Sequence, residues 1–147
     1  MKILAKDKKG LIEAAMGNRD CHLVIVNANI VNMFTGEIYF GNIGIYDGFI
    51  AHVSANIDGY SLEDIKAQRT YDAKGHFVIP GLIDSHIHIE STLMTPRNFA
   101  KEVIPFGTTT VITDPHEIAN VFGVRGVKYM HDSSEGLPMR QYLLAPS

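Results

Sequence analysis

The sequence has little cysteine, little net charge and no long apolar run, and each shortage excludes a class of protein. Its single cysteine, Cys21, cannot form a disulfide within the chain, which indicates a reducing compartment. The formal net charge of −3 lacks the basic excess typical of nucleic-acid binders. No stretch approaches the roughly 18 apolar residues of a membrane span, and the charged start "MKILAKDKKG" fails as a signal peptide. The sequence therefore predicts a cytoplasmic protein that binds neither nucleic acid nor a membrane.

What remains is the composition of a globular protein. The 147 residues are 46% hydrophobic and 20% charged, which suits one good core or two small ones. In residues 1–20, "LIEAAMG" predicts a short helix that acts as an arm packing on another part of the protein. Residues 21–80 are rich in β-formers, and the pairs Asp47–Gly48 and Lys74–Gly75 stand between apolar runs. This region predicts a small antiparallel sheet or part of a β-sandwich, with residues 56–70 as a polar loop.

After Pro80–Gly81, strand and helix patterns alternate. The order is a strand "LIDSHIHI", a helix "TPRNFAKEVIPFG" with Thr95 as N-cap, and a second strand "TTTVIT". One further helix over "DPHEIANVFGVRGVKYMHDSSEG" and a third strand "QYLLAP" follow. Such alternation predicts parallel βαβ units, and hence an α/β fold for residues 81–147. The third strand would present an open edge, so we expect the isolated chain to bind a partner or to aggregate.

Two histidines and two carboxylates alternate along the first of these strands. Side chains on a strand change face at every residue, so Asp84, His86, His88 and Glu90 are expected on one face. Burying four such groups is costly unless they bind something. Imidazoles two residues apart at the end of a parallel strand can converge on one ion, so His86 and His88 are predicted metal ligands. The alternative is a pair of buried histidines bonded to carbonyls. Asp84 would orient an imidazole or serve as a turn carboxylate.

A second candidate, "TDPHEIAN", directly follows the second strand. Asp114, Pro115 and Glu117 fit a helix-capping box, which needs no ligand but leaves His116 unexplained. Since strand ends form the rim of a parallel sheet, His116 and Glu117, together with Glu90, are weaker candidates for contact with a metal or substrate. The other histidines are interpreted as structural or surface residues.

These motifs are similar to a known family. "PGLIDSHIH" resembles the first-strand signature of the amidohydrolase superfamily, whose members fold as a metal-bearing (β/α)8 barrel with a small β-sandwich. The combination of "HIHIES" with the later "TDPHEIAN" is similar to adenine deaminases, which convert adenine and water into hypoxanthine and ammonia. The first piece alone also fits hydantoinases and dihydroorotases.

The resemblance implies that His86 and His88 bind a divalent metal, in a binuclear centre of manganese or iron, with zinc as an alternative. The metal would activate water to attack C6 of adenine. A complete barrel needs about 250 residues, so the chain is expected to be the N-terminal part of the enzyme. Later strands, in the same polypeptide or another chain, would supply the remaining ligands and the acid–base carboxylate. A homo-oligomer is expected. Two alternatives remain open: another amidohydrolase that acts on a cyclic amide, and a non-catalytic metal-binding or assembly fragment.

Overall fold

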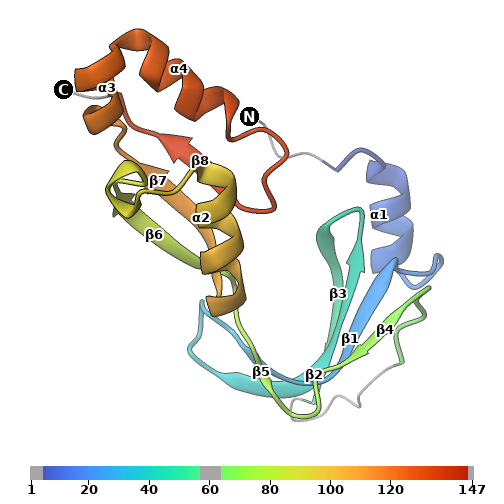
Figure 1. Ribbon diagram of the computed structural model, residues 1–147. Helices are drawn as coiled ribbons and strands as arrows, with labels where there is room; N and C mark the ends of the chain where they lie inside the picture. Colours follow the sequence, from blue (N-terminus) through green and yellow to red (C-terminus); the bar gives the residue numbers. More distant parts are fainter. Residues whose placement is uncertain (1–4, 57–63, 146–147) are drawn as a thin grey trace. The chain divides into compact units, whose positions relative to one another are not determined.

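The computed structural model describes residues 5–56 and 64–145, and the chain divides into two compact units, Met1–Ile79 and Pro80–Ser147 (Figure 1). Residues 57–63 of the predicted loop over 56–70 lie outside the described residues, and its last residue, Thr70, begins strand β4. None of the helices in the described part is long and apolar enough to cross a membrane.

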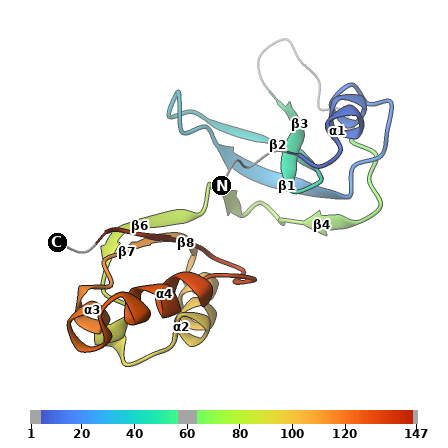
Figure 2. The ribbon, with the colours of Figure 1, turned by 90° about the horizontal axis from the view of Figure 1, so that it is seen from above.

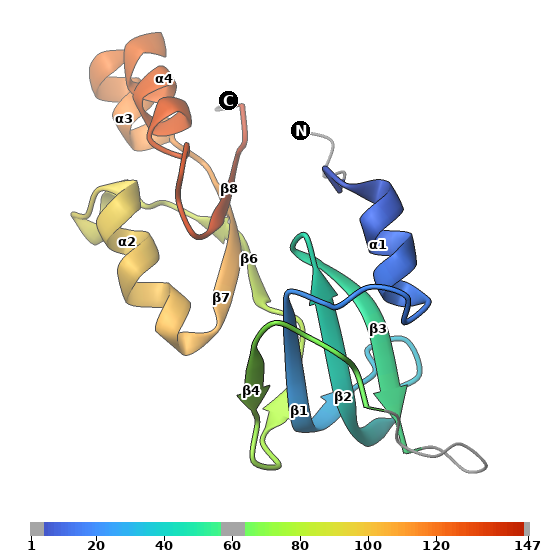
Figure 3. The same ribbon diagram turned by 90° about the vertical axis from the view of Figure 1, so that its right-hand side faces the viewer.

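Unit 1 is built on one mixed sheet, whose strands lie side by side in Figure 3 in the order β3-β2-β1-β4, with β5 also pairing with β1. The strands are β1 (Leu23–Val31), β2 (Ile38–Tyr46), β3 (Phe49–Ala55), β4 (Thr70–Asp72) and β5 (Phe77–Val78). β1 pairs antiparallel with β2 but parallel with β4 and β5. The prediction of an antiparallel sheet is therefore wrong for β4 and β5. β4, which follows β3 in the sequence, lies on the side of β1 opposite to β2 and runs in the same direction as β1.

The turns of unit 1 confirm the local sequence signals. Between β2 and β3, Asp47 and Gly48 have φ angles of 50° and 78°. Two successive left-handed residues give the tight hairpin turn whose twist matches that of its strands. Lys74 and Gly75, with φ angles of 51° and 79°, are also left-handed, but they join β4 to β5, which both run parallel to β1, so this turn does not close a hairpin.

The N-terminal helix α1 (Lys8–Ala15) packs on this sheet, as the predicted arm would. Asp7 caps the helix, because its Oδ1 accepts a hydrogen bond of 2.8 Å from the Gly10 N–H. Ala14 is buried together with Cys21 and Tyr46. The Tyr46 hydroxyl also donates to Asp7 Oδ2 over 2.8 Å, which joins the start of the helix to the end of β2.

Unit 2 contains the predicted parallel βαβ arrangement. Its sheet has the order β6-β7-β8, with both strand pairs parallel, and consists of β6 (Leu82–Ile87), β7 (Thr108–Thr113) and β8 (Arg140–Leu143). The helices α2 (Pro96–Val103), α3 (His116–Phe122) and α4 (Val124–Asp132) lie on the same side of this sheet in Figure 2. Short 3-10 turns, η1 (Glu90–Thr92) and η2 (Ile104–Phe106), complete the unit.

The core of unit 2 lies between the sheet and the helices. It is formed by buried apolar side chains from α2, β7, α4 and the connecting segments: Ile89, Phe99, Ala100, Val111, Met130 and Met139. The start of α2 is as predicted, since Thr95 accepts from the Asn98 N–H. This core holds the carboxyl ends of the strands in fixed positions.

Two predicted elements of unit 2 differ from the structure. The single helix after β7 is broken at Gly123, which has a φ of 59° and a ψ of −146° and separates α3 from α4. The two helices then pack closely at Gly126, where an added Cβ would lie 2.6 Å from the carbonyl oxygen of Ile118. The first strand, in turn, ends at Ile87, so His88 and Glu90 lie beyond it. The predicted four-residue face of one strand is therefore wrong.

Candidate metal centre

The candidate site lies where β6 and β7 end. Ile87 pairs with Thr113 at the last position of each strand. The main-chain N–H of Asp114 then donates to the Ile87 carbonyl over 3.0 Å. Because the strands are parallel, both chains leave the sheet at the same edge, and this bond places Asp114 beside His88.

The two predicted ligands converge. His86 Nε2 and His88 Nε2 are 3.2 Å apart, and the ring planes make an angle of 83°. Two nitrogens that each bind one ion at about 2.0–2.1 Å lie about 2.8–3.4 Å from each other for coordination angles between octahedral and tetrahedral. The observed spacing therefore suits two ligands of a shared ion, although His88 is no longer part of the strand.

A main-chain contact selects the tautomer of His88. Its Nδ1 lies 2.9 Å from the carbonyl oxygen of Asp114. A carbonyl can only accept, so Nδ1 carries a proton in this contact, and the tautomer of the neutral ring that keeps the contact presents an unprotonated Nε2. A histidine that binds a metal is commonly held in this way by a carbonyl behind the ring. The Asp84 carboxylate contacts the main chain, since its Oδ1 accepts from the main-chain N–H of His86 at 3.1 Å. This contact fits the alternative role of a turn carboxylate and not the orientation of an imidazole.

Asp114 is the site residue that the capping-box interpretation misassigned. Helix α3 begins at His116 with Pro115 as N-cap, and no side chain caps it from that position. The Asp114 Oδ1 is buried without a hydrogen-bond partner, while Oδ2 lies 3.3 Å from His116 Nδ1. A buried, unpartnered carboxylate oxygen is costly, and a bound cation would offset that cost.

Ligand-capable atoms gather in two overlapping groups within the described part of the chain. One group contains His86, His88 and Asp114, and the other contains His88, His116 and Glu117. In each group the atoms lie within 4.8 Å of one another. The rings of His88 and His116 are 4.6 Å apart between centroids. His88 thus belongs to both groups, so the two sequence motifs meet around its ring.

The donors present fit a divalent metal. Imidazole nitrogens and carboxylate oxygens together suit manganese, iron or zinc, and the set does not discriminate among them. Glu90 belongs to neither donor group among the described residues. Its Oε1 instead accepts a hydrogen bond of 3.3 Å from the main-chain N–H of Ile118.

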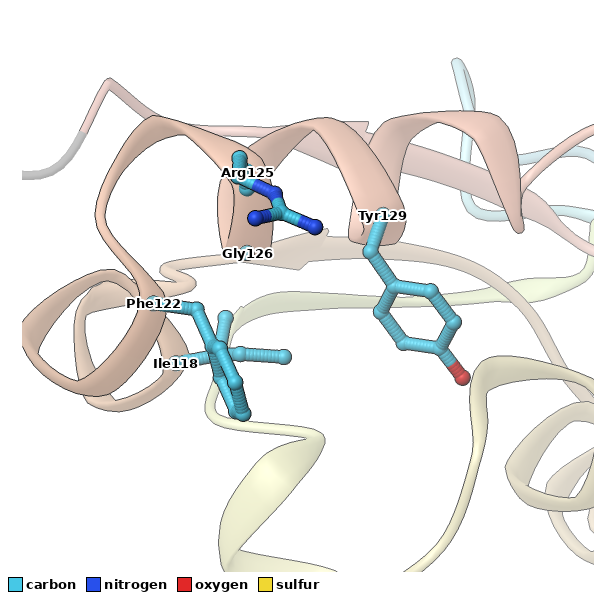
Figure 4. Close-up of a pocket in the computed structure, with 5 residues that line it drawn as sticks. All are labelled: Ile118, Phe122, Arg125, Gly126 and Tyr129. Carbon is cyan, nitrogen blue, oxygen red and sulfur yellow. The ribbon is translucent and has the colours of Figure 1, made fainter.

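A separate pocket lies between α3 and α4 and is drawn in Figure 4. Its volume is about 330 Å³, and its lining consists of Ile118, Phe122, Arg125, Gly126 and Tyr129. This lining contains no histidine or carboxylate, so the pocket offers none of the ligand types that gather at the strand ends.

Comparison with known proteins first shows a likeness of unit 2 to one family. Residues 77–147 match the sequence model of the amidohydrolase family. This range contains β6, β7 and every residue of the two donor groups.

The closer likeness is to adenine deaminases, and it confirms the predicted resemblance. The chain is 47% identical over 137 residues to the adenine deaminase of Thermosipho africanus, covering 93% of this chain and 23% of that protein. It is 42% identical over 142 residues to adenine deaminase 2 of Carboxydothermus hydrogenoformans, covering 97% and 23% respectively. With the adenine deaminase of Listeria welshimeri it shares 44% identity over 131 residues, covering 89% and 21%. The chain therefore spans less than a quarter of the length of these curated relatives.

A solved structure supports the fold. The N-acyl-D-glutamate deacylase of Bordetella bronchiseptica, determined with zinc and a phosphonate inhibitor, superposes with a TM-score of 0.52 and 24% identity. The match covers 65% of this chain and 19% of the deacylase. At this level of identity the likeness bears on the fold alone.

Proposed function

We propose that this chain is the N-terminal part of a metal-dependent adenine deaminase, which converts adenine and water into hypoxanthine and ammonia. The observation that carries the proposal is the convergence of His86 and His88, with their Nε2 atoms 3.2 Å apart, beside the unpartnered carboxylate oxygen of Asp114. The likeness to adenine deaminases over about nine tenths of the chain supports the choice of substrate.

In this proposal His86, His88 and Asp114 hold a divalent ion. The ion would lower the pKa of a coordinated water, so that hydroxide is available near neutral pH. With its Nδ1 donating to the Asp114 carbonyl, the neutral ring of His88 would turn its Nε2 lone pair toward the ion. The main chain of Asp114 thereby orients one ligand while its side chain can serve as another.

His116 and Glu117 are proposed to border the same centre. They share a donor group with His88, and the His116 side chain is 42% exposed, so it can meet a substrate or a second ion. The side chain of Asp114 lies against His116, with 3.3 Å between Oδ2 and Nδ1. A binuclear centre of manganese or iron, or one of zinc, remains part of the proposal.

The edges of the sheet in unit 2 are a candidate contact surface for the remainder of a (β/α)8 barrel. In the described part of the chain, β6 and β8 form the two edges of the sheet. Ile83 on β6 and Tyr142 on β8 are 66% and 48% exposed. Open strand edges that carry exposed apolar side chains are typical of surfaces that another segment covers. We propose that later strands of the enzyme pair with these edges.

The test is turnover by the full-length protein that the proposal implies, after loading with manganese. Loss of the ultraviolet absorbance of adenine, with release of ammonia, is expected for the wild type and not for His88→Ala. Hydantoin and dihydrouracil should not be opened. Ring opening of either compound without adenine turnover would contradict the proposal and favour a cyclic-amide hydrolase.

A further inference from the structure

Helix α3 begins without a side-chain cap of its own. Its N-cap is Pro115, whose side chain offers no acceptor to the free N–H groups of the first turn. A distant carboxylate takes that role, since Glu90 Oε1 accepts from the Ile118 N–H at 3.3 Å. Next to it, the Ser91 hydroxyl donates to Glu117 Oε1 at 2.5 Å.

These two contacts connect the two motifs that contain the candidate ligands. Glu90 and Ser91 lie two and three residues after His88, in turn η1, whereas the first turn of α3 contains Glu117 and lies 26 to 28 residues further along the chain. Two hydrogen bonds therefore connect η1 to α3 beside the candidate metal-binding histidines.

We propose that Glu90 and Ser91 are positioning residues that fix the first turn of α3, so that His116 and Glu117 stay close to His88. The inference deepens the proposed function and rests on it. A role for Glu90 as a ligand would place its oxygens in a donor group with the histidines, and neither group formed by the described residues contains it.

The first test follows amide hydrogen exchange in the full-length, metal-free protein. Glu90→Ala removes the acceptor, so the Ile118 amide should exchange about 3- to 30-fold faster, the range that corresponds to loss of a helix cap. Glu90→Gln keeps an oxygen acceptor and should restore most of the protection. Glu102→Ala, which removes an exposed glutamate of α2, is the matched control and should behave like the wild type.

The second test follows cobalt binding by its visible absorption. Glu90→Ala and Ser91→Ala should each alter the spectrum of bound cobalt and weaken its affinity about 10- to 100-fold, as loss of residues that hold ligands does. Glu90→Gln should restore both properties. If Glu90→Gln is as damaging as Glu90→Ala, or if neither Glu90→Ala nor Ser91→Ala changes cobalt binding, the inference is wrong. If the wild type binds cobalt but does not deaminate adenine, the proposed function is wrong, whereas the positioning role of Glu90 and Ser91 is not contradicted.

Discussion

Unit 1 and unit 2 differ in how their polar side chains are satisfied. In unit 1, the Asp7 carboxylate accepts from the Gly10 amide and the Tyr46 hydroxyl, and these bonds lower the pKa of Asp7. Within residues 5–56 and 64–145, the buried side-chain atoms without a partner all lie in unit 2: Glu90 Oε2, Thr113 Oγ1, Asp114 Oδ1 and Gln141 Oε1. The first three stand at or just after the ends of β6 and β7. Among the described residues, unit 1 thus leaves no buried side-chain polar atom without a partner, whereas in unit 2 the unpartnered Oδ1 of Asp114 stands in a donor group that could receive a cation.

The sharpest way to test this difference is to remove one histidine from each unit. His88→Ala should weaken divalent metal binding by at least about 100-fold, because the ring belongs to both donor groups and even the residues behind a ligand contribute 10- to 100-fold. His76→Ala, in unit 1, should leave the affinity unchanged. Isothermal titration with manganese would measure both variants. Equal affinities in the two would mean that the strand ends do not hold the ion.

Close packing of α3 and α4 gives the next largest effect. Gly126→Ala would place a Cβ 2.6 Å from the carbonyl oxygen of Ile118, and main chain in a packed helix cannot easily move away. We expect unit 2 to lose about 1–3 kcal/mol of stability, as is usual for overpacking. Hydrogen exchange of the α4 amides in denaturant would measure this loss. Unchanged protection would show that the two helices adjust freely.

A smaller loss is expected from the hairpin turn of unit 1. Gly48→Ala puts a side chain on a residue with a φ of 78°, which should cost about 1–2 kcal/mol of unfolding free energy. Gly48→Asn, which tolerates the left-handed region better, should recover part of that loss. Exchange of the β2 and β3 amides would report the change, while manganese affinity should remain that of the wild type. A drop in affinity would show that the two units do not act separately.

The smallest effect concerns pH. Hydrogen bonds from Gly10 and Tyr46 lower the pKa of Asp7. A carboxyl group whose pKa is lower in the folded state stabilises the fold fully above its unfolded value of about 3.9 and loses that contribution as the pH falls through the folded value. Unit 1 should therefore lose stability below about pH 4. Asp7→Asn should flatten this acid dependence, as measured by unfolding in denaturant between pH 2 and pH 6, and an unchanged slope would refute the assignment.

Local signals in the sequence predicted much of the fold. Asp47–Gly48 predicted the hairpin because both residues must be left-handed there, and Thr95 with Pro96 predicted the start of α2. The parallel pairing of β4 with β1 was missed, because strand direction depends on where the chain returns and not on its local pattern. The break at Gly123 was also missed, because the residues on both sides of it follow one continuous helical pattern.

The site was predicted in part for similar reasons. The spacing of His86 and His88 indicated convergence, which their 3.2 Å contact shows, but through the turn after the strand and not along one face of it. The capping-box pattern concealed Asp114, because the pattern is local whereas the burial of its Oδ1 depends on tertiary packing. The position of Asp114 directly after a parallel strand was the signal that could have identified it.

The most direct test of the account is the nitrogen spectrum of the histidine rings of residues 1–147, recorded in the full-length protein as zinc is added. The sequence has seven histidines, which provide internal controls. The account predicts that the ring signals of His86, His88 and His116 shift on binding, with Nε2 of His88 as the metal-bound nitrogen. Those of His22, His52, His76 and His131 should stay in place. Saturation with zinc that leaves His86 and His88 unshifted, or that shifts the histidines of unit 1 instead, would contradict the account.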